Sequence, residues 1–364
     1  MTRPDYPFLL LVLGIAIFAG CTSPREEAES SATSWAAMPK IDVHAHYTYP
    51  RDYLVPLLDK WNMRAAVVEI ITEDERTRWE PMVAHQRRYP EHLILCTTFD
   101  AAKIDEPDFA GNAVAQLRED LERGAKMVKV WKNIGLVYKD ATGTFTQIDD
   151  PRFQPIWDFL TEEDIPVLAH IGEPRAAWMP LDERSPHYHY YANHPQYHFL
   201  GRDDVPAWET VIGARDRWLA ANPDLTVIGA HFGSLSYDVD EIAARLDRFP
   251  NFYVETAERL GDLVIQPRDT VRDFFVKYHD RILYGTDLGT GTPAEDLSAE
   301  ELQREQVDYM EQRFRVHWTY LAEADSVEFV RTGTPFRAPT KGLGLPADVL
   351  HDVYHRNAER LLDL

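Results

Sequence analysis

The stretch Ile41-Asp42-Val43-His44-Ala45-His46 is a short β-rich run that ends in polar side chains. Side chains two positions apart in a strand share a face, so the two imidazoles point the same way. Similar short apolar runs recur along the chain, over residues 65–71, 93–97, 127–131, 166–170, 226–230, 252–255 and 282–284. We therefore expect eight strands, the first of them over residues 41–45.

Helix-like segments separate these runs, over residues 113–123, 155–163, 207–221, 239–248 and 271–278. Near-continuous apolar strands joined by helices predict a parallel sheet that is covered on both faces. Eight such units favour an α/β fold of the (β/α)8, or TIM barrel, type over an open doubly wound sheet. No Gly-x-Gly-x-x-Gly motif follows the first strand, which argues against dinucleotide binding. Extra C-terminal helices are expected over residues 299–324 and from Pro346 onward.

Composition excludes several classes of protein. The 364 residues carry a formal charge of −22, which repels phosphate backbones and argues against nucleic-acid binding. A hydrophobic content of 45% is ample for a large core. The only two cysteines, Cys21 and Cys96, cannot build a disulfide scaffold, and Cys96 lies in an apolar run that predicts a buried core residue.

The N-terminus has the pattern of an export signal. Residues 9–18 are apolar apart from Gly14, and Phe18-Ala19-Gly20-Cys21 resembles a bacterial lipobox. We expect a lipoprotein-type signal peptide over residues 1–20, a flexible tether over 21–39 and the catalytic barrel over 40–364. The mature protein would be held on the periplasmic or extracellular side of a membrane through a lipid on Cys21. Plain secretion and an N-terminal anchor helix are the alternatives.

Polar side chains also end three further strands. His170, His231 and Asp287 each follow an apolar run, where a barrel strand reaches the carboxyl-terminal mouth. A His-x-His pair alone is a weak signal. Together with His44 and His46, however, five such residues at four strand ends are hard to attribute to packing, because the barrel interior is normally aliphatic. The set predicts a metal site.

These residues, in this order on successive strands, resemble the amidohydrolase superfamily. The similar branch contains aminocarboxymuconate-semialdehyde decarboxylase and related TIM-barrel metal-dependent hydrolases. Supporting motifs are Ile-Gly-Ala-His-Phe-Gly-Ser at residues 228–234, Arg-Ile-Leu-Tyr-Gly-Thr-Asp at 281–287 and Tyr-His-Arg-Asn-Ala-Glu-Arg-Leu at 354–361. The resemblance runs from about Ile41 to the C-terminus.

The resemblance implies a role for each residue. His44, His46, His170 and Asp287 would hold one divalent metal ion, and His231 would act as the acid or base beside it. Zn is the default ion for this ligand set, with Mn or Fe as alternatives. Such an ion lowers the pKa of a bound water from 15.7 to about 7. Asp287 would then also accept the proton of that water.

Weaker signals point to substrate-binding residues, namely Lys129, Lys132, Glu173, Arg259 and Tyr284. Alternation along a strand predicts that only one of the two lysines faces the mouth. In the binuclear branch of the superfamily a carbamylated lysine occupies the strand of Lys129, which would allow a second metal. The alternatives are a cation that holds a substrate carboxylate and a buried ion pair. Arg259 could clamp an anion or pair with Asp262.

Two further features lie near the predicted mouth. Residues 172–204 are rich in Pro, Tyr and His and are too long for an ordinary loop after the fifth strand, which predicts a lid over the substrate. Glu69, at the end of the second strand, could orient a ligand histidine. The lid histidines match no known ligand spacing, so we expect them to serve as lid aromatics: His187, His189, His194 and His198.

The sequence thus predicts a metal-dependent hydrolase acting on a small ester, lactone or amide-like compound that carries a carboxylate. Non-oxidative decarboxylation by the same site is the first alternative, and a non-catalytic, ligand-binding surface lipoprotein is the second. The expected partner is a small-molecule substrate. The resemblance also allows a homodimer, which nothing in the sequence establishes.

Overall fold

The computed structural model describes residues 34–71, 76–290 and 298–364. The predicted signal peptide, Cys21 and most of the tether lie outside these ranges, so export and lipid attachment stay predictions. No helix in the described ranges is both long enough and apolar enough to cross a membrane.

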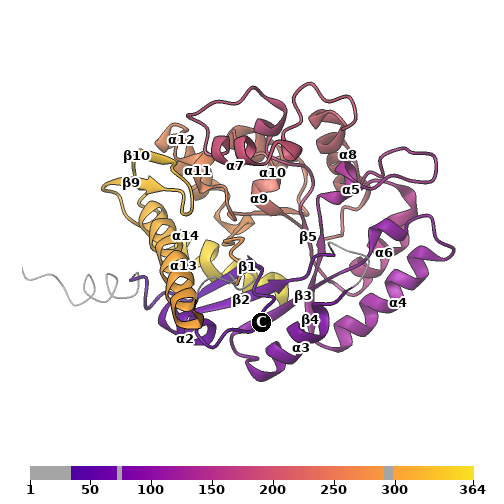
Figure 1. The fold of residues 1–364 in the computed structure, drawn as a ribbon, viewed down its shortest axis with the longest axis horizontal. Helices are drawn as coiled ribbons and strands as arrows, with labels where there is room; N and C mark the ends of the chain where they lie inside the picture. The colour runs from indigo at the N-terminus through magenta and orange to yellow at the C-terminus, as the bar shows by residue number, and fades with distance from the viewer. Residues whose placement is uncertain (1–33, 72–75, 291–297) are drawn as a thin grey trace, which may run out of the picture.

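Eight parallel strands form one sheet in the order of the chain, with helices around it (Figure 1). The first and last strands approach each other through hydrogen bonds from the Val43 amide to the Tyr284 carbonyl (3.0 Å) and from the Asp287 amide to the His44 carbonyl (2.7 Å). The predicted TIM barrel is confirmed. Its strands are β1 (Lys40–Ala45), β2 (Met63–Val68), β3 (Leu93–Thr98), β4 (Ala125–Val130), β5 (Val167–Ala169), β6 (Val227–Gly229), β7 (Phe252–Glu255) and β8 (Ile282–Leu283).

Helices fill the connections, and the predicted ones lie within a few residues of their expected bounds. The longer helices are α2 (Leu54–Lys60), α3 (Trp79–Arg88), α4 (Phe109–Glu122), α6 (Gln154–Glu162), α8 (Trp208–Ala221), α10 (Val239–Arg248), α12 (Arg268–Lys277) and α13 (Ala299–Ala322). The shorter ones are α5 (Asn133–Leu136), α7 (Tyr188–Asn193), α9 (Ala230–Gly233), α11 (Leu260–Leu263), α14 (Ala347–His351) and α15 (Asn357–Leu362), and a π-helical turn, Asp352–Arg356, joins the last two.

Local sequence explains these helices. In α10 the Asp238 side chain accepts a hydrogen bond from the Asp240 amide (3.0 Å) and so caps the first turn. Val239, Ile242 and Leu246 recur at helical spacing and are buried, which places one face of the helix against the barrel.

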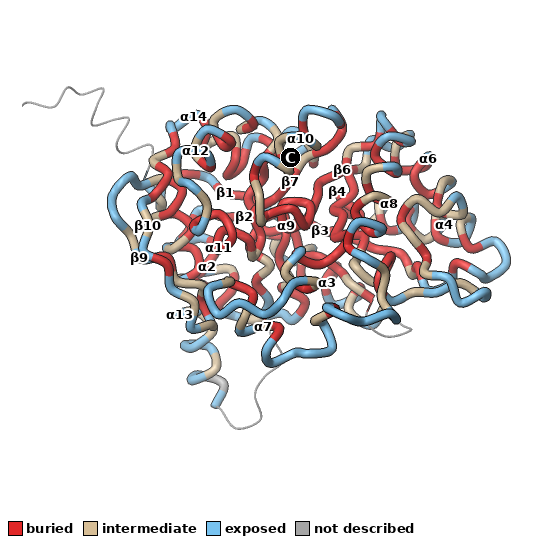
Figure 2. Tube along the Cα trace, turned by 90° about the horizontal axis from the view of Figure 1, so that it is seen from above, coloured by how far each residue is buried: buried red, intermediate tan, exposed pale blue. Residues whose placement is uncertain are grey.

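The barrel is filled by aliphatic side chains. Buried residues lie along the strands, whereas exposed ones lie on the outer helices and loops (Figure 2). Cys96 is buried among them as a free thiol, which confirms its predicted place in the core. The residues that pack inside the barrel include Ile41, Val43, Ala66, Val68, Ile94, Cys96, Met127, Leu168, Ile228 and Leu283.

Two regions depart from a plain barrel. The long connection after β5, which holds α7, and the extra C-terminal helices are present as predicted. An antiparallel hairpin, β9 (Ser326–Val330) paired with β10 (Arg337–Lys341), was not predicted. Pro339 lies within β10, and proline is compatible with a strand only at an edge, so the local pattern did not indicate a strand.

Tyr284 does not lie at the mouth, so its predicted role in substrate binding is wrong. Its ring is buried in the layer between the barrel and the C-terminal helices, 4.7 Å from the ring of Tyr354. Its hydroxyl lies 3.3 Å from Nδ1 of His317 on α13. The residue follows the last paired position of β8, and its side chain faces outward.

His317 should make folding depend on pH. Burial, with Arg313 nearby, lowers the pKa of this imidazole from 6.5 to about 3. Below pH 6.5 the unfolded chain binds a proton that the folded chain does not, so stability is lost as the pH falls. We expect His317→Gln to reduce the loss of unfolding free energy between pH 7 and pH 4 by about 3 kcal/mol. Denaturant titration at both pH values measures this, with exposed His189→Gln as the control, and equal losses in wild type and His317→Gln would contradict it.

Candidate metal centre

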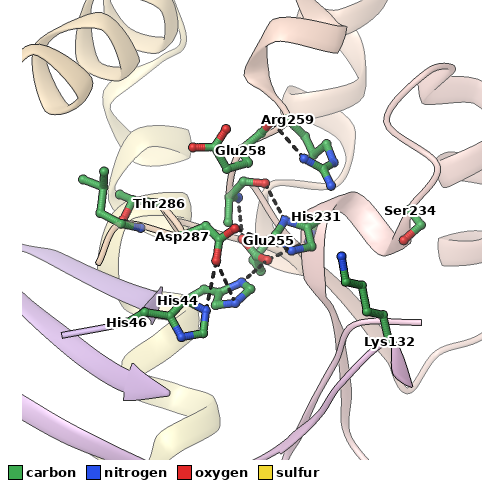
Figure 3. Close-up of polar contacts among 12 residues, drawn as sticks. His44, His46, Lys132, His231, Ser234, Glu255, Glu258, Arg259, Thr286 and Asp287 are labelled. Atoms are coloured by element: carbon green, nitrogen blue, oxygen red, sulfur yellow. Dashed lines mark hydrogen bonds and ion pairs between the residues drawn. The ribbon is translucent and has the colours of Figure 1, made fainter. Parts of the chain in front are cut away.

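Five side chains from four strand ends meet at the carboxyl-terminal mouth of the barrel, and four of them are labelled in Figure 3. His44 lies on β1 and His46 directly follows it, while His170, His231 and Asp287 follow β5, β6 and β8. Oδ1 of Asp287 lies 3.0 Å from Nε2 of His46 and 3.4 Å from Nε2 of His44. Oδ2 of Asp287 lies 4.0 Å from Nε2 of His231. The five side chains that the strand-end pattern predicted to lie together are therefore neighbours in the structure.

His170 presents an unused donor atom to this group. Its ring centroid lies 4.3 Å from that of His231, and its Nε2 is buried without a hydrogen-bond partner among the described residues. Burial, with His231 and Lys132 nearby, lowers the pKa of His170 well below 6.5, so the imidazole is neutral at pH 7. A buried polar atom without a partner is costly, and a neutral imidazole is a good metal ligand. The unpartnered Nε2 of His170 is therefore available as a ligand atom for a metal ion.

Two other imidazoles are oriented through Nδ1. Nδ1 of His44 lies 2.9 Å from Oε1 of Glu255, and Nδ1 of His231 lies 2.8 Å from the carbonyl oxygen of Ala257. Because an acceptor faces each Nδ1, we assign the N–H to that atom and the lone pair to Nε2. Both Nε2 atoms then face Asp287, as metal ligation or proton transfer requires.

The charges around Asp287 keep it ionised. Burial alone would raise the pKa of this carboxyl. The electrostatic effects of His44 and His231, together with the hydrogen bond from His46, lower this pKa well below 3.8. Burial, then Arg259, lowers the pKa of His231 well below 6.5. A carboxylate surrounded by imidazoles is a donor set that suits a divalent ion such as Zn, Mn or Fe.

Backbone strain marks the same positions. His231 and Phe232 have φ values of 59° and 53°, and Asp287 has a φ of 62°. Left-handed backbone is unfavourable for residues other than glycine and persists only where neighbours enforce it. The His231 amide donates to Oε1 of Glu255 (2.7 Å), and the Asp287 amide donates to the His44 carbonyl. The barrel thus holds both side chains in the mouth at a conformational cost.

Glu255 orients the site, whereas the sequence pattern favoured Glu69 for this role. Besides His44 and the His231 amide, its carboxylate accepts a hydrogen bond from the Ala257 amide (2.5 Å). Gly285 makes room for it, since a Cβ there would lie 2.3 Å from Oε2 of Glu255. Glu69 instead pairs with Arg76 (2.6 Å).

The two glutamates are a matched test, because both are fully buried at strand ends. We expect Glu255→Gln to weaken metal binding about 10-fold to 100-fold, since the amide no longer orients the His44 imidazole as a carboxylate does. Glu69→Gln should leave metal affinity unchanged. Titration of the metal-free protein with Zn²⁺ or Mn²⁺ measures both, and equal affinities for the two variants would contradict the role of Glu255.

Lys129 and Lys132 both lie beside the cluster, so the expectation that only one of them faces the mouth is wrong. Lys129 is on β4 and its Nζ lies 3.0 Å from Nε2 of His44. Burial lowers the pKa of Lys129 to about 8. Lys132 lies beyond the end of β4, where strand alternation no longer applies, and it pairs with Glu173. Their substrate-binding roles stay predictions.

The long connection after β5 packs against the loops that follow β7. His187 is buried and its Nε2 lies 2.8 Å from Oδ1 of Asp262. Arg331, just after β9, donates to the Pro186 carbonyl and pairs with Glu258 (3.0 Å). The other histidines of this connection make separate contacts: His189 with Asn193, His194 with the Tyr190 carbonyl and His198 with the Met179 carbonyl.

The residues fit one divalent ion. Nε2 of His170 has no partner within the part of the chain that the structure describes, the imidazoles of His44 and His46 are turned toward Asp287, and the carboxylate is ionised. An ion held by these residues would take the Nε2 atom of His44 that now accepts from Lys129. The ligand atoms of His44, His231 and Asp287 also lie within 4.8 Å of one another, so His231 is near the same point.

The fold is a TIM barrel, and the side chains at its mouth form a candidate metal centre. The sequence model of the family described as amidohydrolase matches residues 41–364, and the chain belongs to that family. A search of curated proteins found no match.

Solved structures share the fold at low sequence identity. One is 2,6-dihydroxybenzoate decarboxylase from Rhizobium, with 18% identity and a TM-score of 0.50 over 90% of this chain and 99% of that one. Another is dihydroxybenzoic acid decarboxylase from Polaromonas sp. JS666 with bound manganese, with 16% identity and a TM-score of 0.51 over 90% and 97% of the chains. At these identities the likeness concerns the fold alone.

Proposed function

We propose that this protein is a metal-dependent hydrolase of a small ester, lactone or amide-like substrate that carries a carboxylate. The observation that carries the proposal is the convergence of the His44 and His46 imidazoles on the ionised Asp287, beside the unpartnered Nε2 of His170. Asp287 is about a quarter exposed, so water and substrate can reach it (27%).

His44, His46, His170 and Asp287 would hold the ion, with Zn as the default and Mn or Fe as alternatives. A divalent ion in such a site polarises a carbonyl and makes water acidic enough to attack it near neutral pH. Asp287 accepts the proton of the attacking water, because its carboxylate is ionised and partly accessible. Its two oxygens face different partners, which lets one serve as a ligand while the other handles the proton.

His231 completes the proton path. Its Nδ1–H donates to the Ala257 carbonyl, so Nε2 carries a lone pair and must take up a proton before it can give one away. Oδ2 of Asp287 lies 4.0 Å from that atom, so the transfer requires one bridging water or a small shift of either side chain. His231 then delivers the proton to the leaving group, and its burial excludes bulk water from that step.

Non-oxidative decarboxylation is the second candidate reaction. After Nε2 of His231 has taken up a proton from solvent, it would deliver that proton to the carbon that loses carbon dioxide, in a step that benefits from the exclusion of water. Two solved proteins with this fold are named as decarboxylases of dihydroxybenzoates.

The two reactions are separated by their products. Purified, metal-loaded protein is screened in parallel for acid release from carboxylated esters, lactones and amides and for carbon dioxide release from hydroxybenzoates. We expect acid release that a chelator abolishes and added metal restores. Carbon dioxide release alone would establish the second candidate. Activity of either kind that a chelator does not affect would contradict both.

A further inference from the structure

Arg259, in the loop after β7, is a buried cation without a carboxylate partner. Its side chain is 6% exposed. Its Nη1 donates to the Glu258 carbonyl (3.2 Å), while its Nε has no hydrogen-bond partner in the described ranges. No carboxylate within those ranges forms an ion pair with it. The other two buried arginines, Arg215 and Arg313, pair with Asp216 and Glu258.

The carboxylates of its neighbours Glu258 and Asp262 are already engaged. Glu258 pairs with Arg313 and Arg331, and although burial would raise its pKa, these cations lower the pKa to about 2. Asp262 pairs with His187 and accepts a hydrogen bond from Ser236 (2.6 Å). The alternative in which Arg259 pairs with Asp262 is therefore not what the structure shows.

Arg259 lies between the metal centre and the lid. Figure 3 shows its guanidinium on the side of His231 that is away from His46. After burial, the charge of Arg259 is the largest influence on the pKa of His231, and it also acts on the lid residues Tyr190 and Tyr191. Lys132 lies near the cluster too, but Glu173 already neutralises it.

We propose that Arg259 binds the carboxylate of the substrate, so that the site acts on small organic anions and not on neutral esters or amides. A buried charge without a counter-ion is unfavourable, and a guanidinium matches a carboxylate with two parallel hydrogen bonds. Bound there, the anion would lie beside His231 and place the rest of the molecule over Asp287. This inference rests on the proposed function for the reaction, but its binding step can be tested alone.

The test measures binding of simple anions to the full chain in its metal-loaded form. Formate, acetate and benzoate are compared with the corresponding neutral amides by calorimetry and thermal shift. The variants are Arg259→Met, Arg259→Lys and the control Arg175→Met. Arg175 is exposed in the lid, with its guanidinium over the rings of Trp208 (5.5 Å) and Tyr237 (5.3 Å).

We expect the carboxylates to bind more tightly than the amides to wild type. Arg259→Met should weaken carboxylate binding about 10-fold to 100-fold, which corresponds to the loss of a charge-assisted hydrogen bond. Arg259→Lys should retain part of the affinity, and Arg175→Met all of it. Without ligand, Arg259→Met should melt at the same or a higher temperature than wild type, whereas Arg313→Met, which removes a cation from Glu258, should melt lower.

Equal carboxylate affinity in wild type, Arg259→Met and Arg259→Lys would overturn the proposal, as would equal binding of carboxylates and amides to wild type. A large fall in melting temperature for ligand-free Arg259→Met would also contradict it, because it would show that Arg259 is paired within the protein. Binding that depends on Arg259 without turnover would refute the proposed function and leave this inference standing. Turnover of neutral substrates that Arg259→Met does not affect would refute this inference and leave only metal-dependent hydrolysis standing.

Discussion

Replacement of Asp287 by Asn is expected to lower turnover by at least about 10³-fold. The amide keeps the shape of the side chain but is a poor metal ligand and cannot accept the proton of the attacking water. Both oxygens of Asp287 are engaged, Oδ1 with His44 and His46 and Oδ2 with His231, so one substitution disturbs ligation and proton transfer together. Metal content and turnover are measured on the same preparation.

The matched control is Asp262→Asn, since Asp262 is a buried carboxylate that pairs with His187 outside the metal centre. Its pKa is lowered, with His187 and Arg259 outweighing the effect of burial, so loss of this charge should loosen the lid more than it affects the chemistry. An Asp287→Asn protein that retains metal and more than a tenth of the wild-type turnover would contradict both assigned roles.

His231→Asn and His170→Asn are expected to fail in different ways. The Asn amide can still donate to the Ala257 carbonyl, so His231→Asn removes only the proton-carrying Nε2. We expect it to bind one metal ion and to lose about 10²-fold to 10⁴-fold in turnover. His170→Asn should lose the metal itself, because the buried Nε2 of His170 is its predicted ligand atom.

The metal content of the two variants decides whether His170 or His231 is the metal ligand. The ligand atoms of His44, His231 and Asp287 lie within 4.8 Å of one another, so the geometry also brings His231 within reach of an ion. Retention of metal by His170→Asn together with its loss from His231→Asn would reverse the two roles and contradict the mechanism.

The barrel and the cluster at its mouth could be predicted because both depend on local patterns. Each strand is a short apolar run, and each site residue ends one, so parallel strands bring residues from 44 to 287 to one edge. The hairpin β9–β10 could not be predicted, because Pro339 interrupts the strand pattern and because Phe329 of β9 packs against Tyr320 of α13 (5.8 Å between ring centroids), a contact that no local pattern indicates.

Side-chain partners were harder to predict than positions. Glu69 and Glu255 each end an apolar run, and nothing local distinguishes the one that pairs with Arg76 from the one that orients His44. The pairing of Asp262 with His187, about 75 residues away, is what leaves Arg259 without a carboxylate. Lys132 reaches the mouth because it lies beyond the end of β4. That strand ends at Val130, whereas the sequence pattern predicted its end at residue 131.

The central claim is that a single ion is bound by four side chains from three strand ends. Anomalous diffraction at the absorption edge of the metal, from crystals of the metal-loaded protein, tests it most directly. We expect one peak within bonding distance of Nε2 of His44, His46 and His170 and of a carboxylate oxygen of Asp287. The absence of a peak there, or a second peak beside Lys129, would contradict the account.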